Sequence, residues 1–168
     1  WAISALAPGC GPSTEPGVRE ATERMSQLTD SMRTALDNMD TASIDHMGAL
    51  FESERPAIEA RFKDTLSKQE AEILGNYHRT MAVTLPRILG DRQRLGQRLD
   101  STRGRLSHLR HDLDQGLLKR SEQREAVSAE QAWDSVLYND MDRLRTDVSQ
   151  LESDRAKYRS AIDPLLRQ

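Results

Sequence analysis

The chain has 168 residues, of which 36% are hydrophobic, 4% aromatic and 30% charged, and its formal net charge is −3. This length fits one domain. The apolar fraction is too small for a thick globular core, yet its regular spacing excludes a disordered chain. An acidic balance argues against a dedicated nucleic-acid binder. Elongated helices with narrow apolar seams fit the composition best.

The N-terminal residues combine small and apolar side chains with the only cysteine of the chain. Gly9 is the small residue directly before Cys10, and a stretch rich in proline and glycine follows. This pattern resembles the cleavage and lipid-attachment box of bacterial lipoproteins, with Ala7 where that box usually has leucine. We therefore expect residues 1–9 to be the remainder of a signal-peptide-like segment. Residues 10–17 are predicted to form a disordered tether.

The resemblance implies that Cys10 carries a lipid and that the protein lies in the cell envelope. Gly11 replaces the aspartate that often retains such proteins at the inner membrane, which favours the periplasmic side of the outer membrane. The alternative is a free thiol in an N-terminal tail. An internal disulfide does not compete with either interpretation, because the chain has a single cysteine. No apolar stretch approaches the ~20 residues that span a bilayer.

Apolar residues at heptad spacing predict a helical domain over 18–168, beginning with a helix over 16–39. The seam of this first helix is expected at Val18, Met25, Met32 and Met39, interleaved with Ala21, Leu28 and Ala35. Methionine repacks easily and suits promiscuous surfaces, but a neighbouring helix is the simpler cover for this seam.

A second helix is predicted over 42–84, with its start near Asp40 and a bend near Pro56. Its stripe comprises Ile44, Met47, Phe51, Ile58, Phe62, Leu66, Ile73, Tyr77, Met81 and Leu85. Pro86 and Gly90 disfavour a regular helix over 85–91, so we expect a reversal or a kink there.

The third segment has the most regular spacing, because its apolar residues alternate steps of four and three. Its seam comprises Ile88, Arg92, Leu95, Leu99, Thr102, Leu106, Leu109 and Leu113. Gly116 marks its expected end, and Ser121 or Ser128 is expected to cap the fourth helix. That helix should run to Ile162 before Pro164 stops it. Its stripe comprises Trp133, Leu137, Met141, Leu144, Val148, Leu151, Arg155, Tyr158 and Ile162.

Charge separates along the chain in a way that favours pairing between helices. Residues 87–124 carry a net +5, whereas residues 13–72 carry −6 and residues 125–168 carry −3. A basic helix between acidic ones would fix which helices pair and in which register. The alternative is an arginine-lined face for lipid headgroups or other anionic envelope groups. The predicted fold is all-α, with long antiparallel helices forming an up-and-down bundle or a hairpin coiled coil.

Candidate chemistry is scarce. His108 and His111 share one helix face at a spacing that metal ligands use, but the leucine seam turns them outward, so we expect no metal site. Glycine-rich phosphate loops and Gly-x-Ser-x-Gly nucleophile motifs are absent from the sequence. We therefore predict no catalytic residue, no cofactor and no enzymatic activity. Trp133 is expected in the seam, the alternative being an exposed aromatic patch with Tyr138.

The sequence favours a lipid-anchored cell-envelope protein that acts through protein–protein contacts, as a scaffold, adaptor or chaperone-like clamp. Its partners would be a membrane, reached through the anchor, and an unidentified protein; self-association through leftover apolar stripes is left open. One alternative resembles the helical periplasmic stress and metal sensors, whose Leu-Thr-x-x-Gln signature corresponds to 28–32, with Met32 in place of glutamine. A second alternative is a cytosolic coiled-coil structural protein.

Overall fold

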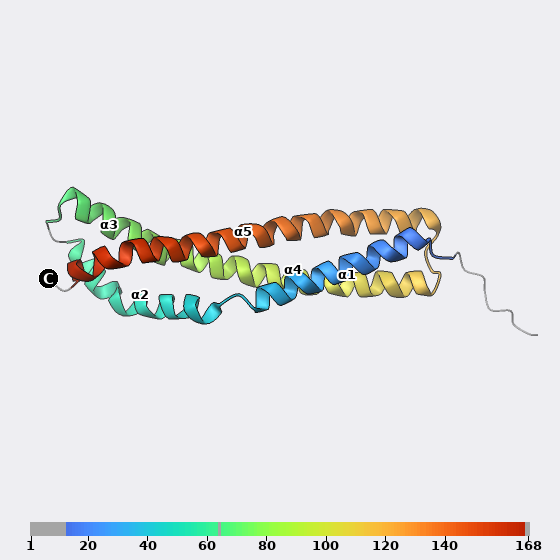
Figure 1. Ribbon diagram of the computed structural model, residues 1–168, viewed down its shortest axis with the longest axis horizontal. Coiled ribbons are helices and arrows are strands. Elements are labelled where there is room, and N and C mark those ends of the chain that lie inside the picture. The colour runs from blue at the N-terminus through green and yellow to red at the C-terminus, as the bar shows by residue number, and fades with distance from the viewer. Residues whose placement is uncertain (1–12, 64, 167–168) are drawn as a thin grey trace, which may run out of the picture. The chain divides into compact units, whose positions relative to one another are not determined.

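The computed structural model of the protein describes residues 13–63 and 65–166, and it is a helical bundle without strands over those residues (Figure 1). Its elements in chain order are α1 (Pro16–Asp37), α2 (Thr41–Arg61), α3 (Lys68–Arg79), the π-helical turn η1 (Thr80–Thr84), α4 (Leu85–Asp114) and α5 (Arg120–Leu166). The predicted all-α class is confirmed. Cys10 and the lipid-attachment pattern around it lie outside the described residues.

The chain divides into two compact units, and the long helices α4 and α5 each contribute to both. Unit 1 contains the described part of Trp1–Ala35 together with Gly96–Asn139, and unit 2 contains Leu36–Leu95 with the described part of Asp140–Gln168. Helix α1 begins at Pro16, so the last two residues of the predicted tether are helical. Proline suits this first turn because its missing N–H has no helical partner there.

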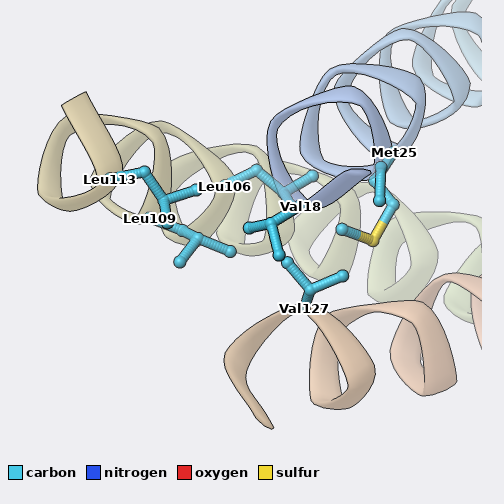
Figure 2. Close-up of a cluster of buried hydrophobic side chains, with 7 residues drawn as sticks. Val18, Met25, Leu106, Leu109, Leu113 and Val127 are labelled. Carbon is cyan, nitrogen blue, oxygen red and sulfur yellow. The ribbon is translucent and has the colours of Figure 1, made fainter. Parts of the chain in front are cut away.

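The core of unit 1 includes an apolar cluster to which three helices contribute. Figure 2 shows side chains of α1, α4 and α5 pointing toward one another. The buried members of the cluster are Val18, Ala21, Met25, Leu106, Leu109, Leu113 and Val127. The methionine at a predicted seam position is thus covered by helices of the same unit. The residues of the predicted α4 seam from Ile88 to Leu113 are buried, except Arg92, which is partly exposed.

The core of unit 2 is built from larger side chains. Ile44, Met47, Phe51 and Ile58 of α2 are at most 1% exposed, as are Leu74, Tyr77 and Met81 from α3 and η1. The rings of Phe51 and Tyr77 meet edge to face with centroids 6.2 Å apart, an arrangement that aromatic pairs prefer. The Tyr77 hydroxyl donates to Glu54 at 3.0 Å, and Arg159 donates to the other oxygen of the same carboxylate at 2.5 Å.

The predicted single helix over 42–84 is wrong, because the chain breaks between α2 and α3. Asp40 caps α2 as predicted, its carboxylate accepting from the Ser43 amide at 3.0 Å. Pro56 lies inside α2 and does not end it. The break comes instead before Ser67, which forms a reciprocal capping box with Glu70. A capping box satisfies two backbone amides at a helix start, so this Ser-x-x-Glu sequence defines a new helix.

A reversal or a kink is predicted at 85–91, and the reversal is wrong, because α3, η1 and α4 follow one another without a turn. The Leu85 amide donates to the Thr80 carbonyl, five residues back, which is the π-helical pattern. Pro86 follows directly. Its ring would clash with the carbonyl four residues earlier and it donates no hydrogen bond, so a widened turn lets the helix continue past it.

The end of α4 is the predicted one. Gly116 has a positive φ of 63°, and the amides of Gly116 and Leu117 donate back to the carbonyls of Leu113 and Asp112. This is a Schellman motif, which glycine favours because it has no Cβ. The predicted serine caps of α5 are wrong: Lys119 precedes the helix, its amide donates to Glu122 at 2.7 Å, and both serines lie inside α5. Pro164 does not stop α5 before Leu166.

Ion pairs join the basic segment to acidic ones within each unit, which confirms the pairing expected from the charge pattern. In unit 1, Arg103 of α4 contacts Asp30 of α1 at 2.6 Å. In unit 2, Arg87 of α4 contacts Asp147 of α5 at 2.7 Å. Exposed pairs of this kind contribute only about 0–1 kcal/mol each, so they select a register more than they stabilise the fold.

Candidate functional site

At two seam positions of unit 1, a polar residue is buried while the larger apolar residue directly before it is exposed. Thr29 is 1% exposed and Asp134 is 4% exposed, whereas Leu28 and Trp133, one position earlier in each case, are 39% and 50% exposed. The predictions that Leu28 and Trp133 fill the seam are therefore wrong. Burying a carboxylate while exposing an indole works against stability, and such local conflicts tend to mark functional sites.

The heptad spacing itself contained the signal for Asp134. Val127, Asp134 and Met141 follow one another at steps of seven, and each is buried. Trp133 falls one residue short of that series. Choosing the most hydrophobic residue of the neighbourhood, rather than keeping the period, caused the error. In α1 the period likewise runs through Thr22, Thr29 and Leu36, not through the predicted Ala21, Leu28 and Ala35, although Ala21 is buried as well.

The carboxyl group of Asp134 has few partners. Its Oδ1 accepts from the Thr29 hydroxyl at 3.4 Å, which is long for a hydrogen bond between oxygens. Its Oδ2 is buried and has no hydrogen-bond partner among the described residues. The nearby guanidinium of Arg105 is engaged elsewhere: it donates to both oxygens of Glu130, at 2.7 and 3.0 Å, and to the Thr102 hydroxyl at 3.0 Å.

This environment changes the acidity of Asp134. Burial raises the pKa of the Asp134 carboxyl above its ordinary value, because removal from water penalises the charged form. The hydrogen bond from Thr29 and the charge of Arg105 act in the opposite direction, while the charge of Glu130 raises the pKa further. Asp134 therefore combines a raised pKa with a buried oxygen to which no described residue donates, and perturbed carboxyl groups of this kind often lie at functional sites.

Asp134 lines a pocket of about 430 Å³ in unit 1. Its wall is formed by apolar Met25, Leu28 and Tyr138 and by polar Gln131, Asp134, Ser135 and Asn139. A mostly apolar concavity with a few polar groups and a residue of perturbed pKa is the usual form of a ligand site. The pocket falls within the range of about 300–1,000 Å³ that such sites occupy.

Exposed apolar residues flank the α5 seam on both sides of the pocket-lining carboxyl. On the α4 side, the guanidinium groups of Arg98 and Arg105 lie 5.9 and 5.8 Å from the centroid of the Trp133 ring. On the α1 side, Tyr138 is 55% exposed and lines the pocket with Leu28. Tryptophan, tyrosine and arginine are the residues most enriched at the energetic centres of protein interfaces.

The residues that the sequence singled out for chemistry do not form this site. Cys10, the predicted lipid-attachment residue, lies outside the described residues. His108 and His111 are exposed on α4, so the prediction that the seam turns them outward is confirmed. Within 13–63 and 65–166, no group of three or more histidine, cysteine or acidic side chains is arranged to hold a metal ion.

Comparisons with known proteins do not assign the chain to a family. No protein-family model, no curated protein and no solved structure matches the chain significantly. Of the described helices, none combines the length and apolarity that a membrane crossing requires.

Proposed function

We propose that the protein is a non-catalytic binding protein of the cell envelope that acts through contacts with a partner protein. The observation that carries this proposal is a set of exposed apolar side chains on both flanks of the α5 seam in unit 1. The set comprises Leu28, Trp133, Val136 and Tyr138 and is called here the unit 1 apolar surface. These side chains are 39%, 50%, 45% and 55% exposed. Exposed tryptophan and tyrosine side chains are enriched at the energetic centres of protein contacts.

The composition of this surface supports a protein partner over a nucleic acid. Two of its four side chains are aromatic, and the guanidinium groups of two arginines lie 5.9 and 5.8 Å from the centroid of the Trp133 ring. Aromatic residues and arginine supply most of the binding energy in protein interfaces. The acidic net charge of the chain disfavours a polyanionic partner.

A photo-crosslinking amino acid placed at Val136 tests the contact in the native host. Val136 is exposed on α5, and His108, exposed on α4 of the same unit, is the matched control position. We expect a discrete crosslinked species from position 136 and none from position 108. Equal products from both positions, or none from either, would count against the unit 1 apolar surface as a contact site.

The membrane anchor is a second part of the proposal and rests on sequence alone. The small residue before Cys10 and the proline- and glycine-rich stretch after it support lipid attachment, with the periplasmic side of the outer membrane favoured. Radiolabelled palmitate tests it. We expect a chain expressed with its native start to incorporate the label and the Cys10→Ala variant not to. Equal labelling of both chains would end the lipid-anchor proposal without affecting the protein contact.

We propose further that the bundle is antiparallel, as an up-and-down or hairpin arrangement requires. Three ion pairs between α1 and α4 support this: Arg19 with Asp114, Asp30 with Arg103 and Arg33 with Asp100. The α4 partner number falls as the α1 number rises, as in helices of opposite direction. A spin label at position 24 of α1 should broaden NMR signals near residue 109 more than those near residue 100; the reverse order would indicate parallel helices.

A further inference from the structure

We propose that the pocket beside Asp134 is a binding site for a small amphiphilic amine, a compact organic ammonium ion with an apolar body. Such a ligand goes beyond the protein contact proposed above, and its binding does not require that contact. The proposal rests on three features of unit 1: an unsatisfied carboxyl, the absence of a compensating cation in the pocket wall, and the apolar character of that wall.

The first feature is the missing hydrogen-bond donor. Asp134 is 96% removed from solvent, its Oδ2 has no partner among the described residues, and the single contact of its Oδ1 is the 3.4 Å bond from Thr29. Buried carboxyl groups normally accept several short hydrogen bonds. Because Oδ2 is itself buried, the ligand must displace the atoms that cover it. An ammonium group carries three N–H donors and would then supply what the chain leaves out.

The second feature is charge. Arg105 donates to both oxygens of Glu130, so the charges of these two residues neutralise each other. Asp134, whose hydrogen bond comes from Thr29, has no cation bonded to it within the described parts of the chain. Asp134 is also the single charged residue among the described residues that line the pocket. A cation therefore complements the site, whereas a carboxylate or phosphate ligand would meet an uncompensated negative charge.

The third feature is the wall that would hold the body of the ligand. Met25, Leu28 and the ring of Tyr138 offer apolar surface, and Tyr138 can also face a cation with its ring. The side-chain oxygens of Gln131, Ser135 and Asn139 are acceptors for further N–H groups. The pocket volume of about 430 Å³ lies within the range of small-molecule sites.

The experiment compares hexylammonium with 1-hexanol, a neutral molecule of similar size, as probes followed by NMR titration of the full chain at neutral pH. We expect hexylammonium to bind about tenfold or more tightly than 1-hexanol, with shifts centred on the pocket, because a charge-assisted hydrogen bond adds to shared apolar contact. The preference should disappear in Asp134→Asn. It should persist in Glu125→Gln, which removes the same charge from an exposed position of α5.

Leu28→Ala, at a position that is 39% exposed, should weaken both probes equally and leave their ratio unchanged. Equal affinity of the two probes for the native chain, or a preference that survives Asp134→Asn, would overturn the proposal. Tighter binding of N-acetyl-lysine-N-methylamide than of hexylammonium would overturn it in favour of a protein lysine. Because the probes are small molecules, failure here would leave the crosslinking result at Val136 unaffected.

Discussion

Two buried polar side chains, Tyr77 of unit 2 and Asp134 of unit 1, differ in how the chain satisfies them. In unit 2 the hydroxyl of Tyr77, a residue with no exposed surface, donates to Glu54, whose second oxygen accepts from Arg159, and Arg159 also contacts Asp163 at 2.7 Å. In unit 1 the carboxyl of Asp134 has one long contact and one oxygen without a partner. A satisfied network rigidifies a core, whereas an unsatisfied one costs stability.

This difference separates residues that hold the fold from residues that are available for binding. The network of Tyr77 can be accounted for entirely within the chain, because each group has its partner. The carboxyl group of Asp134 lacks a full set of partners within the described chain. The large apolar residues next to the seam, Leu28 and Trp133, remain exposed to water. Natural sequences keep such local conflicts mainly where function requires them.

Loss of an apolar side chain from the core should give the largest effect. Leu106 is 1% exposed in the cluster of unit 1, so Leu106→Ala should lower the free energy of unfolding by about 2–5 kcal/mol through lost burial and a residual cavity. His108→Ala, on the exposed face of the same helix, should stay within about 0.5 kcal/mol. Thermal unfolding followed by circular dichroism measures both. Equal destabilisation would mean that the α4 seam is rotated.

Removal of the central acid from unit 2 should also be destabilising. Glu54→Ala leaves the Tyr77 hydroxyl buried without an acceptor and Arg159 without this anion, so we expect a loss of about 1–3 kcal/mol. Glu54→Gln keeps an acceptor for the hydroxyl and should cost less. Native-state hydrogen exchange reports the change locally. Unaltered protection in α3 of the Glu54→Ala chain would show that the network contributes little.

Part of this contrast was readable in the sequence. The period of seven along α4, the polar start of α2 at Asp40 and the glycine end of α4 follow from local rules, and the structure agrees with each. The seams of α1 and α5 were misplaced near Leu28 and Trp133, because hydrophobicity and period conflict there and only the packed helices decide between them. The pocket depends on side chains about 105 residues apart in sequence, which no local pattern brings together.

Removal of the negative charge of Asp134 from unit 1 should raise the free energy of unfolding, in contrast to the two substitutions above. Asp134→Asn keeps the shape and an acceptor for Thr29 while removing a buried, poorly solvated anion, so we expect about 1 kcal/mol of added stability at neutral pH. For a chain of this size the melting midpoint should rise by about 2–4 °C. A fall in the midpoint would show that the charge of Asp134 is compensated.

The pH dependence of this effect follows from the direction of the pKa shift. Because the pKa of Asp134 is raised in the folded state, the folded chain retains a proton that the unfolded chain has lost at pH values between the unfolded and the folded pKa. The contribution of Asp134 to stability therefore falls as pH rises from the unfolded pKa, about 4, through the higher folded pKa, and it stays low above that. The native chain and Asp134→Asn should be equally stable below about pH 4 and diverge above it.

The smallest predicted effect is the coupling between Thr29 and Asp134. A double-mutant cycle of Thr29→Val and Asp134→Asn, measured by chemical denaturation, isolates the contact between the two side chains. At 3.4 Å the hydroxyl lies beyond the usual range for a hydrogen bond between oxygens, so we expect a coupling of about 0.5 kcal/mol or less. A well-formed hydrogen bond to a charged group would give about 1.5–3 kcal/mol. A coupling in that higher range would mean that Thr29 already satisfies Asp134, and the carboxyl would then have little to offer a ligand in the pocket.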